Sequence, residues 1–108
     1  MGKYLLLYTV GNTNPPQTVA ERAAVMQAWM DWFGRLGSAV ADAGNPTSPL
    51  GKTVASNGSV SGVPAGLIVG GYSILAADSL DAAVDMAKGC PQLDAGGDVQ
   101  VFETFDVM

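Results

Sequence analysis

The pattern of apolar and polar positions predicts strands where short apolar runs end in turn-forming residues, and helices where apolar residues recur every three or four positions. We expect strands over 3–10, 38–43, 51–56, 67–76 and 99–105, and helices over 18–36 and 79–88. The segment 38–43 also fits a helical turn, and 59–66 fits a loop or a weak hairpin arm after the turn at Asn57-Gly58. With one strand counted in the region 38–56, the order is β-α-β-β-α-β, which predicts an α+β, ferredoxin-like fold in which two helices cover one face of a four-stranded antiparallel sheet.

The first helix begins with a capping box formed by Thr18 and Glu21 and ends at Gly37. Its apolar stripe at 100° per residue consists of Val19, Ala23, Met26, Met30 and Phe33. Trp29 lies beside this stripe, whereas Trp32 falls at the edge of the polar arc.

The second helix is expected to start at Asp78 as N-cap and to stop at Gly89, before Cys90-Pro91. Its buried stripe is predicted to be Leu80, Ala83, Val84 and Ala87. Gly70-Gly71, in the middle of a strand, indicates a bulge or a close approach of another backbone.

The first strand is apolar on both of its faces, and the strand over 67–76 nearly so. Exposing several Leu and Val side chains costs roughly 1.5–3 kcal/mol each relative to burial. A second copy of the same sheet, packed face to face, would cover them, so we expect a homodimer. The alternative is that the C-terminal tail and the long loops cover that face within one chain.

Composition and charge narrow the possible partners of this single domain, residues 1–108. Five basic and ten acidic residues give a net charge of −5, which argues against nucleic acid and anionic membrane surfaces. The chain has one cysteine and no histidine, so it can hold neither an internal disulfide nor a thiolate–imidazole zinc site. Without a recognisable signal peptide or membrane span, the chain is expected to be cytoplasmic. No metal or other cofactor is expected. A phosphate-binding loop would lie directly before a helix, whereas Gly70-Gly71 lies inside a strand.

Three segments, 3–8, 70–83 and 87–93, span most of the chain together with the strand after Gly97. Because of these segments, the chain resembles the YCII-related (DGPF-type) family of dimeric α+β barrel proteins. The resemblance implies a dimeric α+β barrel. The Asp-Gly-Pro-Phe tetrapeptide of that family is absent before Gly70. The histidine and aspartate proposed as active-site residues in some members have no counterpart pair, because the chain has no histidine.

Several side chains are candidates for a site between the first helix and the sheet. Trp29 and Trp32 could wall a pocket for a flat ligand, or could belong to the core or a dimer contact. Tyr8 and Tyr72 could orient a carbonyl if their hydroxyls converge, or could be buried tyrosines without a role.

Two charged residues complete the candidate set. Asp31 could act as a general base if burial raises its pKa, or could form a surface ion pair with Arg35. Lys52 could neutralise an acidic ligand, or could be solvated. Cys90 is expected to be a structural thiol.

These residues leave three functions open. The first is a small-molecule-binding protein without chemistry of its own, with Tyr8, Trp29, Trp32, Tyr72 and Lys52 around the ligand. The second is a cofactor-independent enzyme, isomerase- or monooxygenase-like, with Asp31 as base. The third is a protein–protein module, which would show no closed cavity.

Overall fold

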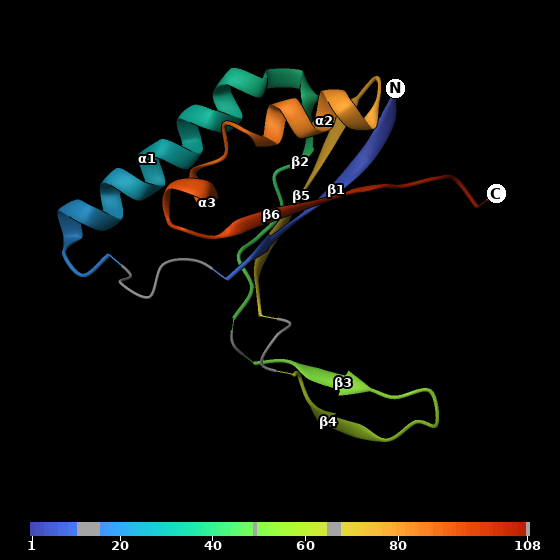
Figure 1. The fold of residues 1–108 in the computed structure, drawn as a ribbon. Helices are drawn as coiled ribbons and strands as arrows, with labels where there is room; N and C mark the ends of the chain where they lie inside the picture. The colour runs from blue at the N-terminus through green and yellow to red at the C-terminus, as the bar shows by residue number, and fades with distance from the viewer. Residues whose placement is uncertain (11–15, 49, 65–67, 108) are drawn as a thin grey trace.

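A computed structural model describes residues 1–10, 16–48, 50–64 and 68–107 (Figure 1). The main sheet has four antiparallel strands in the order β2-β5-β1-β6. Their bounds are β1 Gly2–Thr9, β2 Val40–Asp42, β5 Val69–Ala77 and β6 Asp98–Glu103. The helices are α1 Val19–Leu36, α2 Leu80–Ala87 and α3 Pro91–Asp94, with a 3-10 turn over Gly37–Ala39. The expected α+β class with one four-stranded antiparallel sheet is confirmed, whereas Leu67 and the loop residues 11–15 lie outside the described residues.

The two faces of the main sheet differ in burial. Side chains alternate along a strand, and residues paired across antiparallel strands share a face. Tyr4, Leu6 and Tyr8 of β1 are buried, as are Ser73 and Leu75 of β5, because the helices pack on this face. The core therefore lies between the sheet and the helices.

In the part of the chain that the structure describes, no helix packs on the opposite face of the sheet, which is called the open face below (Figure 1). Leu5 pairs with both Ile74 and Phe102, and Leu7 pairs with Tyr72. The apolar residues of the open face are Leu5, Leu7, Tyr72, Ile74, Ala76 and Phe102, and Lys3 and Gln100 share this face. The C-terminal tail does not bury its own apolar residues there, since Phe105 and Val107 are more than four-fifths exposed. This finding removes the tail as a cover for the open face.

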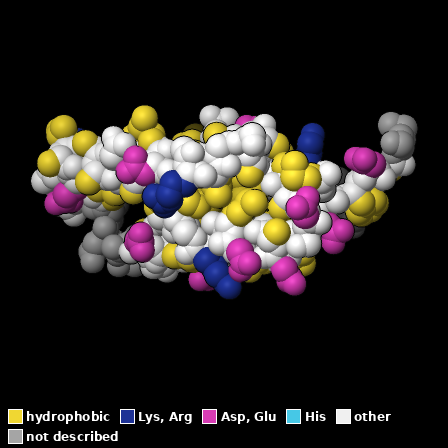
Figure 2. All heavy atoms as spheres, turned by 90° about the horizontal axis from the view of Figure 1, so that it is seen from above, with side chains coloured by type: hydrophobic (Ala, Val, Ile, Leu, Met, Phe, Trp, Pro, Cys, Tyr) yellow, Lys and Arg dark blue, Asp and Glu magenta, His cyan; other side chains and the backbone are white. Residues whose placement is uncertain are grey.

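Helix α1 begins as predicted but buries a different side from the one predicted. Thr18 Oγ1 accepts a hydrogen bond from the Glu21 amide at 3.0 Å, which confirms the N-cap. The predicted apolar stripe is wrong in part: Met30 is 59% exposed, whereas Trp32 is only 1% exposed. Two indole rings and Phe33 bury more apolar surface than flexible methionines do, and the Trp32 Nε1 donates a hydrogen bond to the Met86 carbonyl at 3.1 Å. Figure 2 shows hydrophobic side chains exposed at the end of the molecule where α1 begins.

The second half of the chain differs from prediction at its helix ends. Ser79, rather than Asp78, is the N-cap of α2, because the Ser79 Oγ accepts from the Ala82 amide. Ala83 and Ala87 are buried as predicted, but Leu80 is exposed. The short helix α3 was not predicted, although Pro91 at its first position is a common helix start.

The middle of the chain is divided between the two sheets. Segment 38–43 contains both of the structures expected for it, a 3-10 turn followed by the short strand β2. Strands β3 (Lys52–Val54) and β4 (Val60–Gly62) form a separate hairpin about the predicted turn at Asn57-Gly58, where Gly58 has φ 88°. In the described part of the chain, no helix has the length and apolar character needed to cross a bilayer.

Candidate functional site

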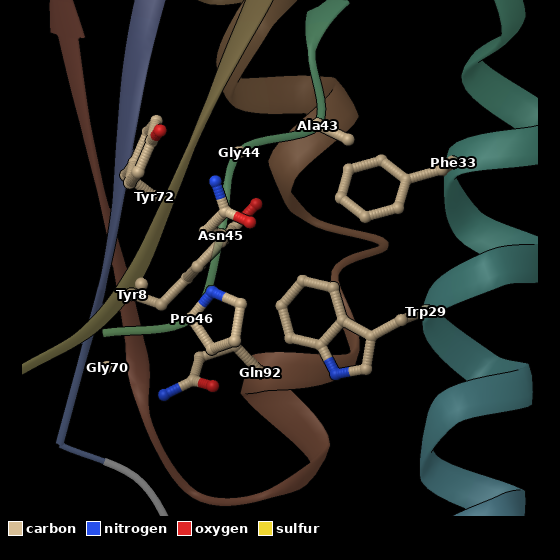
Figure 3. A pocket seen from close by; sticks show the side chains of 11 residues that line it. Tyr8, Trp29, Phe33, Ala43, Gly44, Asn45, Pro46, Gly70, Tyr72 and Gln92 are labelled. Carbon is tan, nitrogen blue, oxygen red and sulfur yellow. The ribbon is translucent and has the colours of Figure 1, made fainter. Parts of the chain in front are cut away.

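A pocket of about 370 Å³ lies between α1 and the main sheet (Figure 3). Its walls come from β1, α1, the segment after β2, the start of β5 and α3. The lining residues are Tyr8, Trp29, Phe33, Ala43, Gly44, Asn45, Pro46, Gly70, Gly71, Tyr72 and Gln92. None of these residues carries a charge, so the pocket is predominantly aromatic and apolar.

Aromatic rings form the wall on the α1 side. The Trp29 ring meets the Tyr8 ring edge to face, with centroids 4.9 Å apart and an interplanar angle of 74°. The ring centroid of Phe33 lies 6.0 Å from that of Trp29 and 5.0 Å from that of Trp32. These separations are typical of stabilising aromatic pairs, so each ring holds the orientation of the next. Trp29 is only half-buried and presents part of its indole to the cavity.

The opposite wall depends on glycines that let two chain segments approach closely. Gly44 has φ 75°, and a Cβ on it would lie 1.8 Å from the carbonyl oxygen of Tyr72. A Cβ on Gly71 would lie 3.1 Å from the Asn45 carbonyl oxygen. Gly70 is the extra residue of a bulge, because Tyr8 pairs with Gly71 whereas Thr9 pairs with Val69. The bulge and close approach predicted from Gly70-Gly71 are therefore both confirmed.

A short hydrogen-bond relay runs behind the pocket. The Tyr8 hydroxyl donates to Ser73 Oγ at 2.6 Å, and Ser73 Oγ donates to the Ala43 carbonyl at 2.6 Å. Burial raises the pKa of Tyr8 from 10.0 to about 12, although the hydrogen bond with Ser73 opposes this shift. The phenol is therefore neutral at physiological pH and already donates its proton within the protein.

The nearby thiol of Cys90 is also kept neutral. Cys90 is buried, and burial raises its pKa from 9.0 to about 11. Because the thiolate is the nucleophilic form, this cysteine is unreactive at neutral pH, in agreement with the structural role expected for it.

Two amide side chains supply polar groups at the rim, and the sequence reasoning missed both. The Gln92 Nε2 donates to the Thr9 carbonyl at 2.7 Å, which ties α3 to the end of β1. Asn45 makes no side-chain hydrogen bond with other described residues, and its amide lies by the cavity in Figure 3. Nothing in the residues around Asn45-Pro46 signals that this segment folds onto Gly71.

The structure separates the residues proposed from the sequence. Tyr8 and Trp29 line the pocket together. Tyr72 lies at the edge of the pocket beside Gly44, but its side chain is on the open face of the sheet. The hydroxyls of Tyr8 and Tyr72 therefore do not converge. Trp32 is buried behind Trp29, with ring centroids 5.8 Å apart, and does not line the cavity.

The two charged candidates lie away from the pocket. Asp31 is on the exposed side of α1, where its Oδ1 accepts a hydrogen bond from Gln27 Nε2 at 2.8 Å. It is not paired with Arg35, because the only salt bridge among the described residues joins Lys88 and Asp85. Lys52 is exposed on β3 of the separate hairpin. Neither side chain is among the residues that line the cavity.

A second cavity of about 590 Å³ lies between the first half of α1 and α3. It shares Trp29 and Gln92 with the first cavity, so these two side chains separate the two spaces. Its rim carries the carboxylates of Glu21 and Asp94. Across the described residues, no cluster of potential metal ligands is found.

The fold and pocket define a class: small α+β proteins with a four-stranded antiparallel sheet, one face covered by helices, and an uncharged cavity between the two layers. In a comparison with family models, the YCII-related domain model matches residues 6–105. The chain therefore belongs to the YCII-related domain family. A search of the curated proteins found no match.

Proposed function

We propose that this protein binds a small, neutral, planar organic molecule in the pocket between α1 and the main sheet. The observation that carries the proposal is the cavity of about 370 Å³, which has aromatic walls and no charged residue among the described residues that line it. Trp29 and Phe33 provide faces and edges on which a flat ring can stack. A cavity of this volume lies within the range of small-molecule sites, roughly 300–1,000 Å³.

The polarity of the pocket determines which ligands it favours. The amides of Asn45 and Gln92 offer hydrogen bonds at the rim, whereas the Tyr8 hydroxyl is already used by Ser73. A charged ligand would lose its hydration without gaining an ion pair, which is costly in an apolar site. The enzyme alternative has no support from this geometry, because neither Asp31 nor any other carboxylate is found among the described residues that line the cavity.

A pair of fluorescent probes with the same ring system tests the proposal. N-phenyl-1-naphthylamine is neutral, and 8-anilino-1-naphthalenesulfonate adds one negative charge. We expect the neutral probe to bind with the lower dissociation constant and to quench tryptophan fluorescence, because Trp29 lines the site. Trp29→Ala should weaken neutral-probe binding about tenfold, whereas Met30→Ala, on the exposed side of α1, should change it by less than about twofold.

A second pair of variants separates pocket binding from adsorption to the open face. Ala43→Leu fills the pocket, and Ala41→Leu places the same side chain on β2 away from the lining residues. Loss of neutral-probe binding in the Ala43 variant alone supports the pocket. Equal binding by both variants, or tighter binding of the sulfonate, would contradict the proposal.

We further propose that two copies pair through their open faces. Phe102 is 49% exposed, and its neighbours across the sheet are Leu5 and Ile74. The chain exposes 7525 Å², whereas a compact monomer of 11.0 kDa is expected to expose about 5,600 Å². The strand order supports the ferredoxin-like arrangement expected from the sequence, in which a second sheet would complete a dimeric barrel.

Two matched charge substitutions test this pairing in sedimentation equilibrium. Phe102→Glu places a carboxylate on the open face, and Met30→Glu places one at a similarly exposed apolar residue of α1. We expect a wild-type dimer that only the Phe102 variant dissociates. A monomeric wild-type protein, or dissociation by the Met30 variant alone, would overturn the open-face dimer.

A further inference from the structure

The hairpin formed by β3 and β4, with its flanking residues, stands apart from the rest of the molecule. We call residues 50–64 the arm. Among the described residues, its strands pair only with each other: Lys52 with Gly62, Thr53 with Ser61 and Val54 with Val60. Figure 1 shows the arm extending away from α1, on the side of the main sheet that no helix covers. The radius of gyration, 15.3 Å, exceeds the about 13 Å expected for a compact chain of this length.

An isolated two-stranded hairpin is at best marginally stable in water, so the arm needs a surface to pack on. Its apolar side chains have none within the described chain. Val54 is 70% exposed and Val60 63%, and they face the same side as a cross-strand pair. Leu50 and Val63 add exposed apolar area at the base of the hairpin.

Charge makes the arm different from the remainder of the protein. Within residues 43–77, Lys52 is the only charged side chain, although the whole chain carries a net charge of −5. Lys52 lies on the same face of the hairpin as Val54 and Val60, since side chains alternate along a strand. The arm therefore presents an apolar, weakly basic face, which suits an acidic protein surface.

We propose that the arm clasps a second copy of this chain, with the Val54–Val60 face against the partner and Lys52 near its acidic surface. This inference rests on the homodimer proposed above. The side to which the arm extends is the side on which an open-face partner would sit. The chain exposes about 1,900 Å² more than a compact monomer of its mass, which exceeds the about 800 Å² that each partner buries in a standard interface. The open face and the arm can therefore both be covered in one dimer.

The chain segments before and after the arm, 43–46 and 70–72, form a wall of the pocket. The Thr47 amide donates to the Gly70 carbonyl at 3.0 Å, and the Tyr72 amide donates to the Asn45 carbonyl at 3.3 Å. Pro46 and Gly71 form an isolated β-bridge at the same place. Because docking of the arm would hold these two segments together, the dimer should bind pocket ligands more tightly than the monomer does.

Adjacent residues on opposite faces of β4 provide a matched test. Val60→Glu puts a carboxylate into the proposed contact, and Ser61→Glu puts the same group on the other face. Both residues are exposed, so neither substitution disturbs the core. By sedimentation velocity across a dilution series, we expect the dimer dissociation constant to rise at least about tenfold for Val60→Glu and less than about threefold for Ser61→Glu.

The outcomes separate the arm from the open-face dimer. A dimer that Phe102→Glu dissociates but Val60→Glu leaves intact would overturn the clasp and leave the open-face pairing standing. Equal weakening by Val60→Glu and Ser61→Glu would overturn the assigned arm face. The link between dimer formation and ligand binding is tested at a protein concentration where Val60→Glu is monomeric and the wild-type protein is dimeric. Weaker binding of N-phenyl-1-naphthylamine by the variant supports this link, and equal binding refutes it.

Discussion

Removing the Tyr8 hydroxyl should destabilise the protein only when Ser73 is present. In the wild-type protein, Tyr8 donates to Ser73 Oγ, and Ser73 Oγ donates to the Ala43 carbonyl. Ser73 is 0% exposed and Tyr8 6%, so water cannot replace a lost partner of either side chain. The three groups therefore form a relay whose members depend on one another.

The hydrogen bonds of Tyr8 and Ser73 determine how much each substitution should lower the free energy of unfolding. Tyr8→Phe leaves Ser73 bonded to Ala43 and should lower the free energy of unfolding by about 1 kcal/mol, the net value of one hydrogen bond. Ser73→Ala leaves the Tyr8 hydroxyl buried without an acceptor, which costs about 1–3 kcal/mol. Adding Tyr8→Phe to Ser73→Ala removes that orphaned hydroxyl, so the double variant should be as stable as Ser73→Ala or more stable.

Urea unfolding at pH 7, followed by tryptophan fluorescence and far-ultraviolet circular dichroism, measures this double-mutant cycle. All four proteins are compared at one protomer concentration, since association adds to apparent stability. The expected coupling energy between Tyr8 and Ser73 is about 1–2 kcal/mol. A Tyr8→Phe cost that is the same in both backgrounds to within about 0.5 kcal/mol would refute the relay.

Two further predictions concern the backbone and alkaline pH. Gly44→Ala should lower the free energy of unfolding by about 3 kcal/mol or more, because the added Cβ would clash with the Tyr72 carbonyl. Gly58 also has a positive φ but has open space around it, so Gly58→Ala should lower the free energy of unfolding by only about 1 kcal/mol. Equal losses for the two variants in chemical denaturation would contradict the close packing at Gly44. Burial raises the pKa of Tyr8 to about 12 and the pKa of Cys90 to about 11, so at alkaline pH the folded chain retains protons that the unfolded chain releases. The free energy of unfolding should therefore be highest below pH 9 and should fall between about pH 9 and 12. The difference between the urea midpoints at pH 8 and pH 10.5 measures this loss of stability. Tyr8→Phe should make the loss smaller, and an unchanged loss in that variant would contradict the assignment of the pH dependence to Tyr8.

Much of the candidate site could not be predicted because it depends on contacts between distant segments. Sequence reasoning found Tyr8 and Trp29, because large aromatic residues on a buried strand and on the adjoining helix face the same layer. It did not find Asn45 or Gln92, which reach the pocket only because a loop and an unexpected short helix fold against the ends of β5 and β1. Trp32 was placed near the ligand because helical periodicity gives a residue's angle but not the side on which the sheet lies.

The amino-acid sequence by itself determined the elements whose signals are local. The apolar runs of β1 and β5, the Thr18 cap and the Asn57-Gly58 turn all act through neighbouring residues, so their positions follow from composition and spacing. Only the tertiary structure decided which face of α1 is buried and that β3 and β4 leave the main sheet. Those choices depend on the packing of whole surfaces, where burying Trp32 outweighs burying Met30, and such competition has no signature within any one segment.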